Sequence, residues 1–435
     1  MTTFDEIIPI LVEIFHDHPD EISMLRPVLI NRDLNSRVRL IVDKKLEDDG
    51  PAQTALEKIT RLMQERLGPH AYEAERAVLF APDIHRELEL EKKIRLEDAE
   101  DVYVVDRLAV EGSWTSISQP GPGAPRIVFF SIKGGVGRST ALAASAWALA
   151  ENGARVLVLD VDLESPGLSS SLLPEDRRPK YGITDWLVED LVNNGDAVFE
   201  DLAATSALSH NGEIIVVPAH GADPGEYVAK LGRVWMPKVD LQGAREGWSR
   251  RLARLLDALE KKWTPDVILI DSRAGIDEVA SACVTDLSAY TVLLFAVDGD
   301  QTWSGYRILF RHWRESGVVR EIRNRIQVVG GMVPETETNK YLDSLLEGAW
   351  NVFSEELYDE VPSGAVATED EYWSFDLVDE GGPHFPWTVM WNRSFAGLKS
   401  LHWRLTDIDV GTVRLVFGPL IGGLKPLLER EQIHQ

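Results

Sequence analysis

Cysteine is nearly absent from this sequence, because Cys283 is the only one among 435 residues. A single thiol excludes an internal disulfide and a cysteine-rich zinc module. Long apolar runs are missing too, since the most apolar expected strand, TVLLFAV (291–297), is far too short to span a bilayer. The first ten residues, MTTFDEIIPI, carry acids where a secretory signal carries bases. We therefore expect a cytoplasmic protein.

Basic residues are in the minority. The sequence has 45 lysines and arginines and 71 aspartates and glutamates, which gives a formal net charge of −26. Such a charge opposes bulk attraction to DNA or to an anionic membrane, since both need lysine and arginine. Residues 245–263 and 311–325 are the basic-leaning stretches, and solvated helix faces are their simpler interpretation. DNA binding through the arginines of 311–325 stays open as the less favoured alternative, and membrane binding is not expected.

Tryptophan is missing from residues 1–113, and all 13 tryptophans lie at or beyond Trp114. The segment that follows, SISQPGPGAP (116–125), has the proline and glycine content of a linker. Before it, apolar spacing predicts alternating short helices and strands, including a strand over LELEKKIRL (88–96). We therefore predict an N-terminal α+β accessory domain (1–115), a linker (116–125) and a larger domain (126–435). The N-terminal part shows no catalytic constellation.

The larger domain contains short β-branched runs separated by helical stretches. The runs are RIVFFSI, RVLVLDV, EIIVVPA, DVILIDS, TVLLFAV and IQVVGGM. Strands with near-continuous hydrophobicity, alternating with helices, are typical of a parallel sheet covered on both faces. The predicted fold class is therefore α/β, with a mostly parallel, doubly wound sheet.

A glycine-rich loop, KGGVGRST (133–140), follows the first of these strands and precedes a helix. Its glycines let backbone N–H groups approach an anion, and the helix points its positive end at the same place. The phosphate-loop pattern ending G-K-[ST] is met at Gly137 and Ser139, but Arg138 replaces the lysine. A dinucleotide-binding G-x-G-x-x-G starting at Gly135 is the weaker alternative, because Thr140 occupies its third glycine.

Three aspartates follow or end strands of the same domain. Asp160 and Asp162 follow RVLVL, and Asp271 follows VILI. Ligands of open α/β sheets bind outside the carboxyl ends of the strands. Carboxylates that meet a Ser139 hydroxyl there provide the hard oxygen ligands that Mg²⁺ takes. The sequence therefore predicts a site for a magnesium-bound nucleotide.

KGGVGRST resembles the deviant Walker A box, KGGxGK[ST], of the ParA/MinD (SIMIBI) P-loop ATPases. DVDLESPG (160–167) is similar to their A′ motif, and VILIDSRAG (267–275) to their Walker B and switch II. The resemblance extends from residue 126 to about residue 335, and the variant is similar to proteins described as KGGVGR-motif ATPases. It implies ATP and Mg²⁺ as cofactors, ATP hydrolysis, and a homodimer that forms around bound ATP.

The resemblance also implies roles for single residues. Three would be catalytic: Lys133 would reach the phosphates of the partner subunit, Arg138 would replace the lysine that acts in cis, and Asp162 would orient the attacking water. The remainder would hold the nucleotide and the metal. The phosphate-binding residues are Gly134, Gly135, Val136, Gly137, Arg138, Ser139 and Thr140, and the Mg²⁺ residues are Ser139, Asp160 and Asp271.

Two positions depart from the family pattern. Arg138 keeps the charge of lysine but brings a wider planar head, and a misplacement of about 1 Å can cost ~10²-fold in rate. Gly330 and Gly331, in QVVGGMVP, stand where many relatives have an asparagine that reads adenine. We therefore predict slow ATP hydrolysis, stimulated by dimerisation or by a partner. A nucleotide-binding scaffold with little turnover and a DNA-associated partitioning ATPase are the alternatives.

Partners are implied only in outline. ATP-dependent dimerisation would act as a switch that recruits or regulates a protein partner through the N-terminal domain. A bacterial defence system or a plasmid- or chromosome-related system is one setting for it. A tyrosine autokinase is disfavoured, because the last sixty residues contain no tyrosine.

Overall fold

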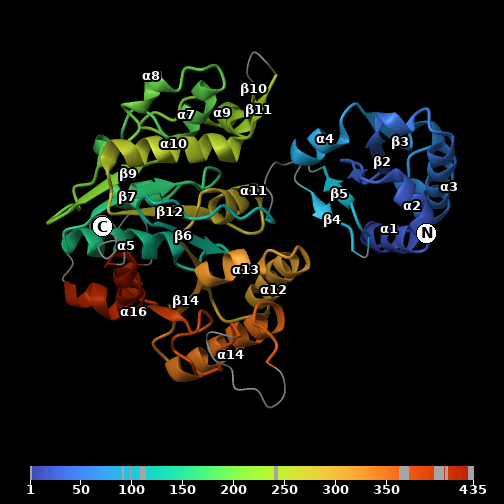
Figure 1. Cartoon of the computed structure of the whole chain (residues 1–435). Helices are drawn as coiled ribbons and strands as arrows, with labels where there is room; N and C mark the ends of the chain where they lie inside the picture. Colours follow the sequence, from blue (N-terminus) through green and yellow to red (C-terminus); the bar gives the residue numbers. More distant parts are fainter. Residues whose placement is uncertain are drawn as a thin grey trace. The chain divides into compact units, whose positions relative to one another are not determined.

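The chain divides into two compact units, Met1–Val110 and Glu111–Gln435 (Figure 1). The computed structural model describes residues 2–90, 93–97, 99–107, 114–239, 243–361, 372–395, 406 and 410–429. Residues 116–125, predicted to be a linker, lie against the second unit. Ile117 is buried in its core, and the Ser118 N–H donates to the Thr285 carbonyl over 2.8 Å.

The first unit is an α+β domain with a five-stranded sheet in the order β3-β2-β1-β5-β4. Helices α1 to α3 cover one face of the sheet, and α4 contributes to a smaller cluster on the other. Its strands are β1 (Val28–Arg32), β2 (Val38–Asp43), β3 (Val78–Ala81), β4 (Ile94–Arg95) and β5 (Val102–Asp106). Its helices are α1 (Ile7–His16), α2 (Pro19–Leu25), α3 (Gly50–Leu67) and α4 (Ile84–Leu90).

One predicted strand of this unit is wrong. Residues 88–90 belong to helix α4, and of the described residues 93–96 only Ile94 and Arg95 form a strand. The Asp83 carboxylate caps the helix by accepting hydrogen bonds from the backbone N–H groups of His85 and Arg86. Ile84 and Leu88, one turn apart, then bury against the sheet. The helix cap and the burial of this apolar pair therefore favour a helix over the strand that the alternating apolar residues predict.

The second unit confirms the predicted α/β fold, with an eight-stranded sheet in the order β15-β14-β13-β6-β12-β7-β9-β8. All neighbouring strands are parallel except β8, which pairs antiparallel with β9. The strands are β6 (Arg126–Ser131), β7 (Arg155–Asp160), β8 (Ala204–Thr205), β9 (Glu213–Val217), β12 (Val267–Ala274), β13 (Thr291–Ala296), β14 (Ile326–Val333) and β15 (Trp387–Met390). A separate hairpin pairs β10 (Lys238–Val239) with β11 (Arg245–Glu246).

Helices cover both faces of this sheet (Figure 1). On one face lie α5 (Arg138–Glu151), α6 (Leu168–Leu172) and α16 (Val410–Glu429). The other face carries α7 (Ile183–Asp190), α10 (Trp248–Trp263), α12 (Asp300–Glu315) and α14 (Thr338–Glu356). Shorter α-helices in the described part of this unit are α8 (Asp196–Phe199), α9 (Tyr227–Val234), α11 (Glu278–Ser281) and α13 (Val319–Ile322).

Strand β6 shows why the β-branched runs that form this sheet are apolar at every position. Ile127 and Phe129 enter the core on the α5 face, whereas Val128 and Phe130 enter the core on the opposite face. Side chains alternate along a strand, so a strand buried on both faces needs apolar residues at every position. The central position of β6 between β13 and β12 sets the place of the glycine-rich loop that follows it.

The apolar C-terminal segment packs onto the body of the second unit as helix α16. Gly423 of α16 lies so near β15 that a Cβ added to it would be 2.4 Å from the Trp387 ring. Glycine therefore permits this close helix-to-strand contact. Among the described residues, no helix has the length and hydrophobicity needed to cross a membrane.

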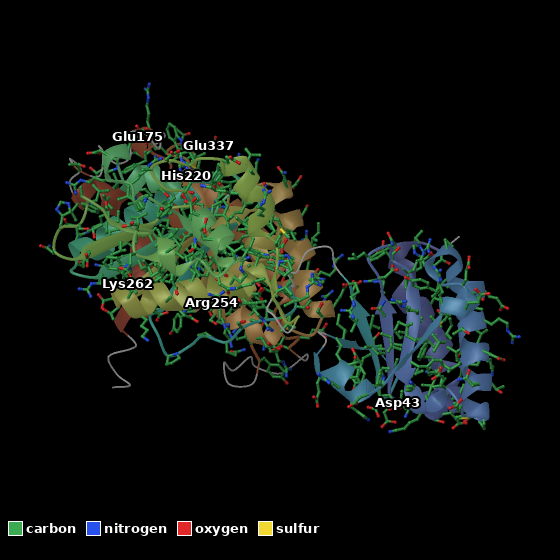
Figure 2. The ribbon with its side chains drawn as sticks, turned by 90° about the horizontal axis from the view of Figure 1, so that it is seen from above. Asp43, Glu175, His220, Arg254, Lys262 and Glu337 are labelled. Carbon is green, nitrogen blue, oxygen red and sulfur yellow. The ribbon has the colours of Figure 1, made fainter. Side chains whose placement is uncertain are left out.

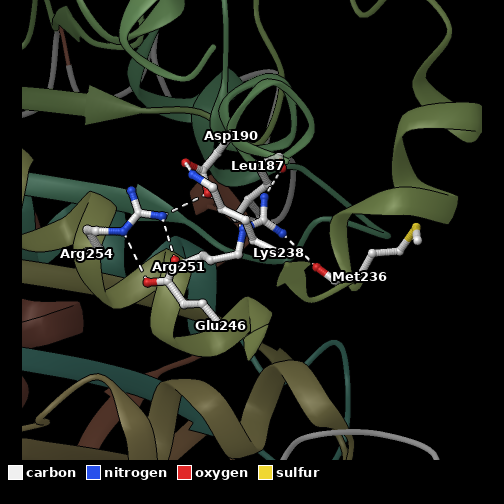
Figure 3. A network of polar contacts seen from close by, with 7 residues as sticks. All are labelled: Leu187, Asp190, Met236, Lys238, Glu246, Arg251 and Arg254. Carbon is white, nitrogen blue, oxygen red and sulfur yellow. Dashed lines mark hydrogen bonds and ion pairs between the residues drawn. The ribbon is translucent and has the colours of Figure 1, made fainter. Parts of the chain in front are cut away.

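The basic-leaning stretch 245–263 supplies an internal network (Figure 3). The buried Asp190 carboxylate accepts from Arg251 Nε at 2.8 Å, from Arg254 at 2.9 Å and from Lys238 at 2.9 Å. Burial alone raises the pKa of Asp190, but these hydrogen bonds hold that pKa below its usual range. The network fastens the β10–β11 hairpin between α7 and α10, so these cations serve the fold.

The arginines of 311–325 are largely committed to ion pairs as well. Arg311 and Arg314 both pair with the buried Glu356, and Arg323 pairs with Asp359 at 2.7 Å. Acidic side chains such as Glu175 and Glu337 project from the surface of the unit (Figure 2). Arg251, Arg311 and Arg323 are therefore engaged by acids of the fold.

Candidate functional site

The glycine-rich loop joins the end of β6, at Ser131, to the start of α5, at Arg138. Gly135 and Gly137 have φ values of 75° and 85°, which side chains with a Cβ rarely adopt. The two glycines let the chain turn sharply while the first turn of α5 faces the loop. Unpaired N–H groups and the positive end of a 14-residue helix then converge there.

The predicted acidic residues lie beside this loop. Asp271 of β12 pairs in register with Asp160 at the end of β7, and β12 is the neighbour of β6. Asp162 follows Asp160 by two residues. The structure therefore brings the three carboxylates to the carboxyl end of the sheet, next to the start of α5, as the sequence predicts.

Arg138 binds these acids directly. Its side chain is only 8% exposed, and its Nε donates to Asp271 Oδ1 at 2.7 Å. Its two terminal nitrogens donate over 3.3 Å to Asp162 Oδ2 and to the Ser131 hydroxyl. Burial lowers the pKa of Arg138, but the charges of Asp271 and Asp162 raise it above the usual value. The guanidinium is therefore charged and turned toward the strand ends.

Asp160 is buried, and it has one satisfied oxygen and one unsatisfied oxygen. Ser169 donates to Oδ2 from its N–H at 3.2 Å and from its hydroxyl at 2.9 Å, whereas Oδ1 has no partner. Burial first, and then the charge of Asp271, raises the pKa of Asp160 to about 7. Sequence reasoning missed Ser169, although it lies in the first turn of a helix directly after the DVDLESPG segment.

Asp162 also keeps one buried oxygen, Oδ1, without a partner. Burial raises its pKa, and Arg138 opposes that rise. Three carboxylates and one guanidinium leave two excess negative charges if all four groups are ionised. Among the described residues, no group of three or more histidine, cysteine or acidic side chains is arranged to hold a metal ion by itself.

The carboxylate oxygens of this site fit Mg²⁺ as part of a ligand set that also includes phosphate. Mg²⁺ is usually held by one or two carboxylates together with phosphate oxygens and waters, without a complete cage of protein ligands. Two unpartnered carboxylate oxygens and an excess negative charge beside an anion-binding loop match that requirement. The residues therefore suit a metal that arrives with a phosphate group.

Other predicted residues stay apart from the carboxylates. Lys133 is exposed on the outer part of the loop, and within the described chain no ion pair includes it. Ser139 and Thr140 are half-buried in the first turn of α5. Gly134 and Gly135 are exposed, whereas Val136 is buried. The predicted loop residues therefore run from the end of β6 to the first turn of α5, with both exposed and buried members.

Strand β14 lies against the loop at Gly331, the second of the adjacent glycines Gly330 and Gly331. A Cβ added to Gly331 would lie 2.3 Å from the Val136 carbonyl oxygen, and one added to Gly330 would lie 2.7 Å from Leu345. A side chain at residue 331 would therefore collide with the backbone of the loop. Met332 follows with a φ of 56° and sits against Gly137. An asparagine does not fit at residue 331 in this arrangement.

Comparison with known proteins agrees with this geometry. Residues 127–343 match the model of the CobQ/CobB/MinD/ParA nucleotide binding domain. This part of the chain is a ParA/MinD-like P-loop ATPase domain. The sequence matches no protein with a curated function.

Many solved structures are similar to this chain, and three of them are described here. The septum site-determining protein MinD complexed with Mg-ADP, from Pyrococcus horikoshii, is 25% identical over 49% of this chain and 71% of its own, with a TM-score of 0.34. MinD of Aquifex aeolicus is 18% identical over 64% and 87% respectively, with a TM-score of 0.37. ParA of pNOB8 bound to nonspecific DNA is 16% identical over 72% and 99%, with a TM-score of 0.44. At these TM-scores the structural likeness adds nothing to the family match.

A second ion-paired group joins two loops of the ATPase domain. Arg273, two residues after Asp271, pairs with Glu164 at 2.7 Å and with Asp277 at 3.2 Å. Glu164 lies in the DVDLESPG loop, so Arg273 connects that loop to the segment after β12. Arg273 is one-third exposed, so its ion pairs are weaker than those of Arg138.

A cleft of about 570 Å³ in the ATPase domain has a lining that includes none of these carboxylates. Its lining includes Pro120, Arg126, Glu260 and Tyr290, which precede or begin strands of the sheet. Ligands of parallel α/β sheets bind at the opposite, carboxyl ends of the strands. We therefore place the nucleotide site at the loop 133–140 and not in this cleft.

The contact between Gly331 and the loop predicts a large effect of a small change. We expect Gly331→Ala to destabilise the ATPase domain by about 1–3 kcal/mol, because a methyl group cannot share space with the Val136 carbonyl. Tryptophan fluorescence during urea unfolding reports on this domain, since residues 1–113 contain no tryptophan. Gly232→Ala, where an added Cβ meets nothing within 4 Å, is the matched control. An unchanged urea midpoint for Gly331→Ala would contradict this packing.

Proposed function

We propose that this chain binds ATP with Mg²⁺ and hydrolyses it slowly, within a homodimer in which each copy lends Lys133 to the other. The single observation that carries the proposal is the meeting of a glycine-rich helix start with three strand-end carboxylates, two of which keep an unpartnered buried oxygen. The exposed position of Lys133 supports the dimer, because its ammonium is available to a second molecule.

The phosphates would lie against the backbone N–H groups of residues 134–140 and the positive end of α5. The Ser139 hydroxyl, Asp160 and Asp271 would hold Mg²⁺, which when bound neutralises charge on the phosphate oxygens. Asp162 would orient the attacking water by accepting a hydrogen bond at its unpartnered Oδ1. Lys133 of the second copy would add a positive charge where negative charge develops on the transferred phosphoryl group.

Slow turnover follows from the same geometry. Arg138 is engaged with Asp162 and Asp271, so productive binding requires these contacts to change. A guanidinium also differs in shape from the lysine of an ordinary phosphate loop. A binding scaffold with little turnover remains the second candidate, and the ion-paired Arg138 is the observation that favours it.

The switch would couple ATP-driven dimerisation to a protein partner. The N-terminal unit, with its own core and no tryptophan, would be the partner-binding module. We extend the proposal to a cytoplasmic role in a bacterial defence system or a plasmid- or chromosome-related system. The DNA-associated alternative gains no support from the arginines of 311–325, since Arg311, Arg314 and Arg323 are ion-paired.

Calorimetric titration with ATP, with and without Mg²⁺, together with phosphate release and light scattering, tests the proposal. We expect Mg²⁺-dependent ATP binding, turnover below about 1 s⁻¹, the lower end of ordinary enzymes, and a doubling of the particle mass with ATP. Absence of ATP binding at millimolar concentration would refute the proposal. Binding and dimerisation without phosphate release would establish the scaffold instead.

A further inference from the structure

Arg138 makes a contact set that only a guanidinium can make. Three different nitrogens of one side chain reach three different groups: Nε reaches Asp271, and the terminal nitrogens reach Asp162 and Ser131. Lysine carries a single nitrogen on a flexible stem, so it cannot span these groups with the same geometry. Arginine in place of lysine at residue 138 therefore allows contacts that a lysine could not make.

The guanidinium occupies oxygens that a divalent cation would need. Asp271 Oδ1 and Asp162 Oδ2 both accept hydrogen bonds from it, and Asp271 is almost completely buried. A metal ion at the same carboxylates would lie within a few ångströms of a fixed positive charge, in a site where water screens little. Arg138 and a bound metal ion therefore compete for the same negative charge.

We infer that Arg138 is a built-in cation that blocks metal binding in the nucleotide-free protein, and that a phosphate group must draw it away before Mg²⁺ can bind. This inference rests on the proposed nucleotide site and specifies its order of events. Arginine forms bidentate hydrogen bonds with phosphate oxygens as well as with carboxylates. Arg138 directly follows Gly137 of the loop, so its side chain starts beside the proposed phosphate position.

Removal of the Arg138 guanidinium would leave the carboxylates around it without their main positive partner. Asp162 and Asp271 would then lose the guanidinium that pairs with both of them, and Asp160 Oδ1 and Asp162 Oδ1 already lack partners. Buried charges without partners are costly, so any divalent ion able to reach them is expected to bind. Arg138 is thus a positioning residue for the metal, and its role differs from plain structural support.

Manganese binding to the nucleotide-free, full-length protein tests this inference. Free Mn²⁺ is measured by electron paramagnetic resonance for the wild type, Arg138→Gln, Arg138→Lys and Arg273→Ala. Arg273→Ala is the matched control, because it removes an arginine that pairs with acids nearby but contacts neither Asp162 nor Asp271. We expect Arg138→Gln to bind Mn²⁺ at least ~10-fold more tightly than the wild type, since a unit charge beside the metal is gone.

The two other variants have expected results of their own. Arg138→Lys is expected to bind Mn²⁺ with intermediate affinity, and Arg273→Ala like the wild type. Equal Mn²⁺ affinity of Arg138→Gln and the wild type would overturn the inference, as would tight Mn²⁺ binding by the wild type without nucleotide. Tryptophan fluorescence verifies that each variant is folded, and Arg138→Lys keeps the test decisive if Arg138→Gln unfolds. Because no nucleotide is present, failure here is distinct from failure of ATP binding by the wild type.

Discussion

Replacing Lys133 by alanine is expected to abolish ATP-dependent dimerisation and to lower turnover by about 10³- to 10⁵-fold, the range for a cation supplied in trans. Lys133 is exposed on the loop, and no ion pair described in the structure engages it. Its ammonium is therefore available to the triphosphate of a second molecule. Phosphate release and light scattering with ATP and Mg²⁺ measure the two effects.

The matched control for this change is Lys340→Ala. Lys340 is 83% exposed, lies in the first turn of α14 and makes only a long 3.9 Å pair with Glu337. This variant is expected to dimerise and turn over as the wild type does, because surface pairs of this kind contribute little. Wild-type turnover by Lys133→Ala would refute the trans-acting lysine. Loss of dimerisation in both variants would show that the assay responds to surface charge alone.

Asp162→Asn is expected to lower turnover by about 10²- to 10⁴-fold while ATP-dependent dimerisation persists. Asparagine keeps the size of the side chain and an oxygen that accepts from Arg138, but it removes the carboxylate that orients water. The unpartnered Oδ1 of Asp162 is the atom that carries this expectation. Single-turnover phosphate release measures the chemical step, and light scattering measures the dimer.

Asp176→Asn serves as the control, because Asp176 is an exposed aspartate in a short 3₁₀ turn. Its turnover is expected to match that of the wild type. Unchanged turnover in Asp162→Asn would remove Asp162 from the reaction. A variant that no longer dimerises with ATP would show instead that Asp162 supports nucleotide binding.

Most of the ATPase domain fold was predictable from the sequence. All six β-branched runs are strands, because a strand buried on both faces must be apolar throughout, as β6 is from Ile127 to Phe130. The short strands β8 and β15 were not predicted. β8 has two residues and β15 has four, so neither is long enough to show a period of its own.

The candidate site was predictable in position but not in contacts. Strand-to-helix order locates the loop and Asp160, Asp162 and Asp271, because parallel strands end at one edge. The rotamer of Arg138 depends on three groups distant in sequence, and no local pattern encodes it. The closeness of Gly331 to Val136 is likewise a tertiary contact, visible only once β14 is placed beside β13.

A crystal structure of the protein with Mg²⁺ and a non-hydrolysable ATP analogue is the most direct measurement. The account predicts two copies facing each other, with each Lys133 Nζ within hydrogen-bonding distance of a phosphate bound by the other copy, and with Arg138 moved off Asp271. A single copy without analogue in its loop, or with Arg138 still bound to Asp162 and Asp271 beside the phosphates, would contradict it.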